Sequence, residues 1–351
     1  MFPELPTPIA LVDLDVFARN IERGRAQAER LGVALRPHAK TVKSPALMAK
    51  VLAAGASGLT VSTLTELETL RELCADIMYA VPTAEGKKRR ILDALADADI
   101  RLALVVDSIE GSRGVPSDSR IDVAIEVDCD GRRGGVEPDS DDLLAIGEVL
   151  GSRLRGVMTH AGASYVVSPA EAAAAERDAV VGAASRLRKA GHDFDMVSVG
   201  SSPSFFAAQT LDGVSEARPG VYLFGDESQV ALGSARPDEV ALTVLTTVIG
   251  RRGGTAIIDA GWSALSQDRG APVVEGSGFG VVDGFGDLIV ESATQEHGMV
   301  VSREGGDPGL AIGDRIRIRP LHACATAEMH RYLVTTRGDQ VMATVERPRG
   351  W

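Results

Sequence analysis

The sequence predicts an α/β protein made of an eight-stranded β/α barrel of the TIM type and an all-β domain. Between about residues 30 and 220, short apolar runs alternate with longer amphipathic ones, which is typical of βα units around a parallel sheet. Beyond about residue 235 the chain changes to β-branched runs separated by Gly, Asp and Arg turns. We therefore expect the barrel at residues 14–235 and the β domain at residues 1–13 and 236–351.

The barrel prediction depends on eight short strand candidates. They are Val33–Pro37, Ser57–Val61, Asp76–Ala80, Arg101–Val106, Ile121–Asp128, Leu154–His160, Asp195–Val199 and Ser215–Arg218. Helix-like stretches lie between them, including Pro45–Ala54, Leu64–Cys74, Gly86–Ala96, Asp141–Leu150 and Pro169–Ala190. Eight parallel strands favour a closed barrel, in which the loops after the strands carry the reactive groups.

The second region contains five further strand candidates. They are Val240–Ile249, Thr255–Asp259, Arg315–Arg319, Tyr332–Thr336 and Gln340–Val345. Near the start of the chain, Ile9–Asp13 is also strand-like and precedes a predicted helix at Leu14–Leu31. This first segment could belong to either domain.

Composition narrows the possible partners and the compartment. The 351 residues carry a net charge of −12, so the phosphate backbone of a nucleic acid would be repelled overall. No apolar run approaches the roughly 20 residues that a membrane span needs, and the first residues lack the features of a signal peptide. Three widely spaced cysteines give no disulfide framework. We expect a cytoplasmic protein that binds neither nucleic acid nor membrane.

Lys40 lies just past the first predicted strand, in the segment Arg36-Pro37-His38-Ala39-Lys40-Thr41. A lysine that forms a Schiff base must lose its proton, and the neighbouring Arg36 and His38 would lower its pKa. Most lysines are nevertheless solvated surface residues, and Lys43 is a rival where the next helix should start. Position alone therefore leaves Lys40 as a candidate.

A loop of glycine and hydroxyl residues, Ser198–Ser204, follows the seventh predicted strand and contains Pro203, which suits the first turn of a helix. Backbone N–H groups at a helix start bind phosphate, although an ordinary capped turn would have the same composition. Barrels commonly hold phosphate after strands seven and eight. The position of this loop, with Gly220 and Tyr222 after the eighth strand, therefore favours a phosphate site.

His322-Ala323-Cys324 places an imidazole and a thiol two residues apart. On a strand both would point to the same side, where they could ligate one borderline metal ion. Two ligands do not make a structural zinc site, but a catalytic ion leaves positions for water or substrate. The alternative is a buried cysteine beside a hydrogen-bonded histidine.

Seven motifs occur in the order found in one enzyme family. They are RPHAKT (36–41), THAGASY (159–165), SVGSSPS (198–204), EARPGVYLFGD (216–226), DAGWSALSQDRG (259–270), QEHG (295–298) and PLHAC (320–324). Through them the chain resembles the metal-activated, fold-type III pyridoxal-phosphate enzymes of the D-serine dehydratase and D-threonine aldolase family. Within that family it is most similar to the D-threo-3-hydroxyaspartate dehydratases, and the resemblance covers nearly the whole chain.

The resemblance implies an alanine-racemase-like barrel with a β domain, a homodimer, and pyridoxal 5′-phosphate as cofactor. It implies that Lys40 is the catalytic Schiff-base lysine and that His322 and Cys324 are catalytic ligands of a divalent metal, zinc or manganese. The other implied cofactor contacts are Ser201, Ser202, Gly220 and Tyr222 around the phosphate, and Arg133, His160 and Tyr165 around the ring.

Of the positions at which the chain departs from the family pattern, three become less polar. Leu321 stands where the family often has Asn, so a hydrogen bond that supports the metal site is expected to be missing. Val42 and Ala163 replace residues that are often polar in the family. A less polar pocket suggests that the substrate differs from those of the relatives.

The implied reaction is the loss of water from a D-3-hydroxy amino acid of the D-threo-3-hydroxyaspartate or D-serine type, which gives a 2-oxo acid and ammonia. The main alternative is retro-aldol cleavage to glycine and an aldehyde. A non-catalytic pyridoxal-phosphate carrier is a third hypothesis, against which the β domain and the His322–Cys324 pair argue. A racemase is a fourth, and it would not need the metal.

Overall fold

The computed structural model describes residues 2–82, 85–96, 98–274 and 276–351, and the chain forms two compact units. The barrel unit comprises Arg23–Gly220 with Gly350–Trp351. The β unit comprises the described residues up to Glu22 together with Val221–Arg349.

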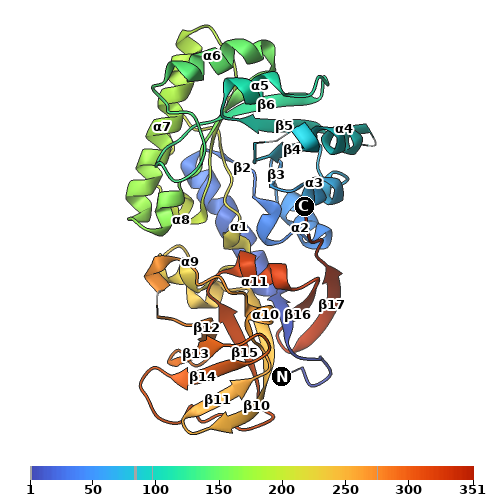
Figure 1. Cartoon of the computed structure of the whole chain (residues 1–351), viewed down its shortest axis with the longest axis vertical. Coiled ribbons are helices and arrows are strands. Elements are labelled where there is room, and N and C mark those ends of the chain that lie inside the picture. The colour runs from blue at the N-terminus through green and yellow to red at the C-terminus, as the bar shows by residue number, and fades with distance from the viewer. Residues whose placement is uncertain (1, 83–84, 97, 275) are drawn as a thin grey trace. The chain divides into compact units, whose positions relative to one another are not determined.

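Eight parallel strands form the sheet of the barrel unit (Figure 1). They are β2 (Ala34–Leu35), β3 (Leu59–Val61), β4 (Asp76–Tyr79), β5 (Arg101–Val106), β6 (Ile121–Glu126), β7 (Leu154–Met158), β8 (Met196–Val199) and β9 (Glu216–Ala217), in the order β2-β9-β8-β7-β6-β5-β4-β3. Backbone hydrogen bonds from Ser57 N to Leu35 O (2.8 Å) and from Thr60 N to Pro37 O (3.0 Å) link the two outermost strands. The predicted barrel and its eight strands are therefore confirmed.

Helices connect these strands and cover them. They are α1 (Leu14–Leu31, whose second half lies in this unit), α2 (Pro45–Ala53), α3 (Leu64–Leu70), α4 (Lys88–Ala96), α5 (Ile109–Arg113), α6 (Asp141–Leu150), α7 (Pro169–Lys189) and α8 (Ser202–Ala207), with short 3₁₀ turns η1 (Ala39–Thr41), η2 (Glu85–Lys87), η3 (Gly151–Arg153) and η4 (Gly162–Tyr165). Thr63, Ser108 and Ser140 begin helices by accepting a hydrogen bond from a backbone N–H of the first turn.

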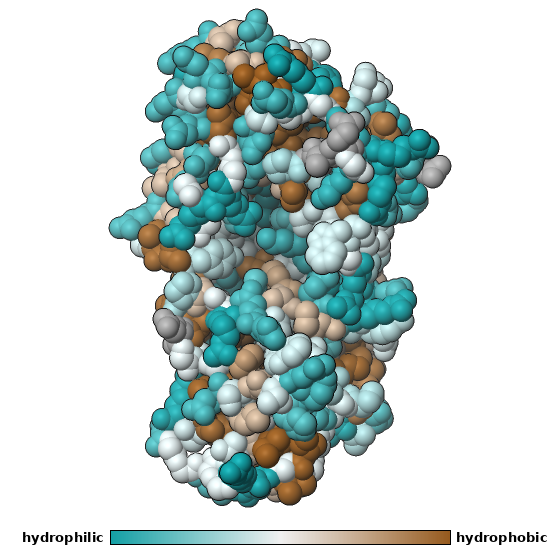
Figure 2. Space-filling model, in the orientation of Figure 1, coloured by the Kyte–Doolittle hydropathy of each residue, from teal (hydrophilic) through white to brown (hydrophobic). Residues whose placement is uncertain are grey.

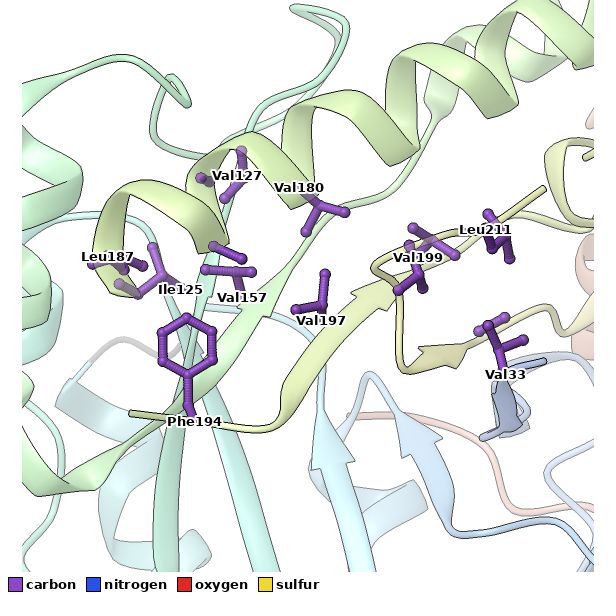
Figure 3. Close-up of a cluster of buried hydrophobic side chains, with 14 of the residues drawn as sticks. Val33, Ile125, Val127, Val157, Val180, Leu187, Phe194, Val197, Val199 and Leu211 are labelled. Carbon is purple, nitrogen blue, oxygen red and sulfur yellow. The ribbon is translucent and has the colours of Figure 1, made fainter. Parts of the chain in front are cut away.

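A large hydrophobic cluster of the barrel unit lies between its strands and its helices. Figure 3 shows Val180 and Leu187 of α7 facing Ile125, Val157 and Val197, which come from three neighbouring strands. A separate, smaller cluster consists of Met78, Ala103, Val105, Ala124, Met158 and Met196. Because the strands pack on both faces, they are continuous apolar runs, which explains why they could be recognised in the sequence.

The amino-terminal ends of the barrel strands carry ion pairs instead. Arg36 is 3% exposed and bonds through Nε to Glu216 at 2.9 Å and through Nη2 to Asp76 at 3.0 Å. Asp76 also pairs with Arg155. These residues line a polar cavity of about 510 Å³. The floor of the barrel, defined here as these strand ends, is therefore held by buried charges that compensate one another.

Nine strands form the sheet of the β unit. They are β1 (Ile9–Asp13), β10 (Leu242–Arg252), β11 (Thr255–Ile258), β12 (Gly280–Val282), β13 (Leu288–Ala293), β14 (Gly298–Ser302), β15 (Arg315–Pro320), β16 (Tyr332–Arg337) and β17 (Gln340–Glu346). The order is β11-β14-β13-β12-β15-β10-β1-β16-β17, and β10 also pairs with β11, which closes six strands into a barrel. The predicted all-β domain is confirmed, and β1 lies inside its sheet between β10 and β16.

The helices of the β unit are short. They are the first part of α1, α9 (Glu227–Ala231), α10 (Trp262–Leu265) and α11 (Ala323–Met329), with 3₁₀ turns η5 (Val221–Leu223), η6 (Pro237–Glu239) and η7 (Pro272–Val274). Residues 221–235 belong to the β unit. Phe224 packs on Phe17 with ring centroids 5.9 Å apart, and Ser228 bonds to the Leu321 carbonyl.

Polar residues cover most of the visible surface, and apolar residues are scattered among them (Figure 2). The exposed large apolar side chains include Val166, Val167, Phe285, Ile312 and Trp351. Among the described residues, none of the helices combines the length and the hydropathy that crossing a bilayer requires. Single exposed apolar residues of this kind are common in proteins and indicate no particular function.

Candidate functional site in two halves

Lys40 lies in the turn η1, directly after the first barrel strand. His38 precedes this turn, and its Nδ1 accepts a hydrogen bond from the backbone N–H of Lys40 at 3.3 Å. The backbone of His38 is fixed on both sides, because its N–H donates to Pro219 O at 3.1 Å and the residue bridges to Thr60. The barrel thus holds Lys40 at the carboxyl ends of the strands, which we call the mouth.

Lys43, the rival lysine, has a different environment. It is 7% exposed, and its Nζ lies 3.4 Å from Oε1 of Glu66, which is itself 1% exposed. Its backbone has a φ of 54°, so it begins no helix. A lysine in a buried ion pair is not available to a ligand, and this geometry favours Lys40.

Two neutral imidazoles lie near Lys40. Burial lowers the pKa of His38 well below its usual value, and the charges of Lys40, Arg218, His160 and Arg133 lower it further. Burial, followed by the charges of Arg133, Lys40 and Arg218, likewise keeps the pKa of His160 well below the usual range. The mouth therefore concentrates positive charge that its own histidines do not share, which suits an anionic ligand.

Arg218 is the residue at this mouth that sequence reasoning missed. It follows β9, is 4% exposed, donates through Nη2 to Thr159 O at 2.6 Å and bonds through Nη1 to Ser198 Oγ. Ser198 in turn donates to Glu216 at 2.7 Å. The motif EARPGVYLFGD contained Arg218, but the sequence offers no sign that its side chain is buried.

The glycine and hydroxyl loop runs from β8 into α8. Ser201 has a φ of 104°, an unusual conformation for a residue other than glycine, and its Oγ lies 2.6 Å from Ser164 Oγ of the turn η4. A Cβ on Gly200 would lie 3.1 Å from Arg218 Nη2 and 3.2 Å from His160 Nδ1. The loop is therefore packed against the cationic mouth, as a phosphate-binding loop would be.

Glu176, from α7, supports this loop from behind. It is 2% exposed, and its Oε1 accepts hydrogen bonds from Ala161 N (3.0 Å) and Gly200 N (2.7 Å), while Oε2 accepts from Ser204 Oγ (2.8 Å). Burial raises the pKa of Glu176 to about 7. One buried carboxyl thus joins the loops after β7 and β8. No sequence motif indicates its role.

Four further residues were proposed from the sequence as cofactor contacts. Tyr165 belongs to the turn η4, and the charge of Arg133 lowers the pKa values of both His38 and His160. Gly220 is required by a close approach, since a Cβ there would lie 2.8 Å from His38 O. Tyr222 lies in the β unit and is 1% exposed.

Glu126, at the end of β6, is a further titratable group of the mouth. It is 7% exposed, and burial raises its pKa to about 7 despite the opposing charge of Arg218.

Ser202, the remaining phosphate candidate, is the first residue of α8. The first turn of a helix offers backbone N–H groups that have no acceptor within the helix. Hydroxyls, these amides, a lysine and the buried Arg218 fit a phosphorylated aldehyde cofactor.

His322 and Cys324 form the second half, in the β unit. The prediction that they lie on one strand is wrong, because β15 ends at Pro320, His322 is the N-cap of α11 and Cys324 lies in its first turn. The run from Ala323 to Met329 is rich in alanine, with Glu328 and Met329, all strong helix formers. The turn still brings the thiol of Cys324 within hydrogen-bond reach of the His322 ring.

Two carboxylates adjoin this pair. Asp268 Oδ2 lies 2.9 Å from His322 Nδ1. Asp226 is fully buried and accepts hydrogen bonds from Ala323 N and Gln229 N, both at 2.8 Å. Burial lowers the pKa of His322, but Cys324, Asp268 and Asp226 outweigh it and raise that pKa to about 11. Burial raises the pKa of Asp226 to about 6.

The donor chemistry of this pair fits a catalytic metal. Imidazole nitrogen and thiolate sulfur are the ligands that zinc prefers, and an electron-rich surrounding favours a divalent cation. Among residues 2–82, 85–96, 98–274 and 276–351, no three or more His, Cys, Asp or Glu side chains are arranged to hold an ion. Two protein donors would leave the other coordination positions to water and substrate.

Comparison with protein families agrees with this division of the chain. Residues 12–228 match the family described as "Alanine racemase, N-terminal domain", and residues 241–336 match the one described as "Putative serine dehydratase domain". The lysine, the histidines and the glycine and hydroxyl loop fall in the first match. His322 and Cys324 fall in the second.

Individual relatives match nearly the whole chain. D-threo-3-hydroxyaspartate dehydratase of Delftia sp. (strain HT23) is 42% identical over 99% of this chain and 98% of its own. D-serine dehydratase of Dictyostelium discoideum is 28% identical over 99% and 98%. D-threonine aldolase of Arthrobacter sp is 29% identical over 94% of this chain and 89% of its own.

Solved structures show the same likeness. D-threo-3-hydroxyaspartate dehydratase from Delftia sp. HT23 has a TM-score of 0.93 at 40% identity and covers 99% of both chains. D-threonine aldolase from Filomicrobium marinum has a TM-score of 0.84 at 27% identity, covering 97% of this chain and 95% of its own. Alanine racemase from Bacillus anthracis, at 18% identity, 98% coverage of both chains and a TM-score of 0.71, shares the fold.

Proposed function

This chain belongs to the fold-type III pyridoxal-phosphate enzymes of the D-serine dehydratase and D-threonine aldolase family, and we propose that it is a dehydratase of D-3-hydroxy amino acids. The substrate would be of the D-threo-3-hydroxyaspartate or D-serine type, and the products a 2-oxo acid and ammonia. The observation that carries this proposal is the His322–Cys324 pair. A metal at that pair could assist the departure of a hydroxyl group, whereas racemisation would need no such ion.

Pyridoxal phosphate, bound at the barrel mouth, would supply an electron sink for the α-carbon, and a zinc or manganese ion at His322 and Cys324 would supply a Lewis acid. Lys40 would anchor the cofactor through Nζ and, once the substrate amine replaces it, take the α-proton at the same atom. The two roles explain why a lysine beside neutral imidazoles is useful. The pKa values of His38 and His160 lie well below the usual range, so both are weak bases that would not compete with Lys40 for the proton.

The remaining residues would bind and orient. Ser201 and Ser202 would donate hydroxyl or amide hydrogen bonds to the phosphate, together with Gly220 and Tyr222. The buried guanidinium of Arg218 joins them as a fixed positive charge at the mouth. Residues around the cofactor ring would be Arg133, His160 and Tyr165. Loss of the α-proton and of the β-hydroxyl gives an enamine, which hydrolyses to the 2-oxo acid and ammonia.

The proposal is tested by incubating the purified protein, loaded with cofactor, with D-3-hydroxyaspartate, D-serine and D-threonine. Each reaction is run with and without a chelator, and oxo acid, ammonia and glycine are assayed. We expect equal amounts of oxo acid and ammonia, which the chelator abolishes and zinc or manganese restores. Glycine and an aldehyde as main products would identify an aldolase instead, and activity insensitive to the chelator would refute the role of the metal.

Two further parts of the proposal concern the protein as a whole. The family resemblance predicts a homodimer in the cytoplasm, and light scattering on the purified protein would measure the mass against that of the 36.8 kDa chain. Metal analysis of protein purified without added ions would identify the cation. A monomer, or a protein that retains no divalent ion, would contradict these parts without affecting the others.

A further inference from the structure

The side chain of Asp268 lies against the ring of His322 on the nitrogen nearer the backbone. Asp268 Oδ2 is 2.9 Å from His322 Nδ1, and the two side chains are 43% and 35% exposed. An Nδ1 that donates to a carboxylate carries the hydrogen of the neutral ring, so that Nε2 presents its lone pair. When a metal ion takes the place of the proton on Nε2, this contact keeps the remaining ring hydrogen on Nδ1.

The loop that carries Asp268 is itself tightly held. Oδ1 of Asp268 accepts from Gly270 N at 2.8 Å, and its backbone N–H donates to Ser266 Oγ at 3.0 Å. Ser266 has a φ of 76°, and Gly270 has a φ of 72°. A carboxylate fixed through one oxygen keeps the other in a constant place.

Ser228 joins this loop to the metal-ligand segment. Its Oγ accepts from Ala271 N at 2.9 Å and donates to Leu321 O at 2.6 Å. A Cβ on Gly270 would lie 2.5 Å from the same Oγ, so the loop approaches α9 as closely as glycine allows. The carboxylate and the histidine are therefore tied to one hydroxyl, and their separation does not depend on their own hydrogen bond alone.

The side chain of Leu321, next to His322, is 2% exposed and apolar. A polar residue at that place was the expected source of support for the metal site, and in this chain Leu321 contributes only its carbonyl. Asp268 lies 54 positions earlier in the sequence, so no local motif could have indicated it. The structure supplies the missing hydrogen bond from a distant loop.

We propose that Asp268 is a positioning residue of the metal site, which holds His322 so that Nε2 faces the ion and increases the affinity for a divalent cation. This inference depends on the proposed metal site at His322 and Cys324. Partners of this kind orient the ligand and raise its basicity, and their loss typically lowers metal affinity about 10- to 100-fold. Asp268 does not contact the substrate in this role.

The test measures metal binding without turnover. Wild type, Asp268→Ala, Asp268→Asn and Cys324→Ala are loaded with pyridoxal phosphate, stripped with a chelator and titrated with Co²⁺, whose charge-transfer absorbance reports a thiolate–cobalt bond. We expect Asp268→Ala to bind Co²⁺ about 10- to 100-fold more weakly and Asp268→Asn to lie between it and wild type, because an amide still accepts a hydrogen bond but carries no charge.

Asp307→Asn is the matched control. Asp307 also accepts from the N–H of a glycine two residues on, Gly309, at 2.9 Å, and that glycine also has a positive φ of 71°. Asp307 contacts neither His322 nor Cys324, so the Asp307→Asn protein should bind Co²⁺ with the affinity of wild type. Thermal unfolding of the metal-free proteins shows whether a variant has lost structure. If Asp268→Ala has, the Co²⁺ affinity of Asp268→Asn is the one that tests the proposal.

Two outcomes separate this inference from the proposed function. Wild-type affinity in both Asp268 variants, with a loss in Cys324→Ala, would overturn the positioning role and leave the metal site intact. Equal binding by wild type and Cys324→Ala would overturn the metal site itself, and the role of Asp268 with it.

Discussion

The barrel mouth and the surroundings of His322 and Cys324, which we call the two halves, share one device, although they lie in units of different architecture. In the barrel unit, Glu176 accepts hydrogen bonds from backbone amides of two loops, at Ala161 and Gly200. In the β unit, Asp226 does the same for two segments, at Gln229 and Ala323. Each carboxyl is buried and joins segments far apart in the sequence. In each unit, one acidic side chain thus fixes a segment that carries candidate ligands.

The halves differ in the charge that they present. At the barrel mouth, burial and the neighbouring cations lower the pKa values of His38 and His160. In the β unit, burial also lowers the pKa of His322, but Cys324 and the acidic residues outweigh it and raise that pKa to about 11. The first surrounding favours an anion and the second a cation. This difference corresponds to the two groups that the proposed reaction needs, a phosphorylated cofactor and a metal ion.

The largest expected effect separates the two lysines of the mouth region. Lys40→Ala should lose the visible absorbance of bound cofactor and at least about 1000-fold of activity, because anchor and base disappear together. Lys43→Met should keep the absorbance while losing about 3 kcal/mol of stability or more, since it leaves Glu66 buried without its partner. Absorbance spectra and urea unfolding measure the two effects. A Lys40→Ala protein that retains the absorbance would falsify the assignment.

Loss of the metal half should leave the cofactor half intact. Cys324→Ala is expected to reduce activity at least about 100-fold, because a Lewis acid contributes several kcal/mol to such a step. Its cofactor absorbance should equal that of wild type. Cys74→Ala, which changes a cysteine of the barrel unit, is the control and should remain active. If Cys324→Ala also lost the cofactor, the two halves would not be independent.

The shared device can be tested at Glu176. Glu176→Ala leaves two buried amides without an acceptor, which costs about 1–3 kcal/mol each and loosens the phosphate loop. We expect the affinity for pyridoxal phosphate to fall about tenfold, as measured by fluorescence titration. Glu171→Ala changes an exposed residue of the same helix and should bind normally. Unchanged affinity in Glu176→Ala would show that the loop holds its shape unaided.

The last expected effect is a dependence of stability on pH. Burial raises the pKa of Glu176 from 4.5 to about 7, so the folded state favours the protonated form more than the unfolded state does. Its contribution is present below pH 4.5 and is lost as the pH rises through 7, which amounts to about 3 kcal/mol. In cofactor-free protein, Glu176→Gln should remove this part of the difference between urea unfolding at about pH 5 and about pH 8. An identical pH profile would contradict the shifted pKa.

The sequence predicted the eight barrel strands because strands that pack on both faces consist of continuous apolar runs. It predicted Lys40, His322 and Cys324 through motifs. It missed Arg218, Glu176 and Asp268, because each acts through contacts with residues far away in the chain, which no local pattern records. It also missed β12, β13 and β14, since β12 has three residues and the pairing of β13 with β14 contains a register shift.

The place of β1 has a consequence for the order in which the protein folds during synthesis. This strand pairs with β10 and β16 in the middle of the nine-stranded sheet, so both of its partners are made after the barrel unit. The barrel unit is an insertion between them, and its strands are complete once residue 220 has left the ribosome. Domains generally fold as they emerge. During synthesis, β1 therefore has no partner strand until the barrel unit has formed.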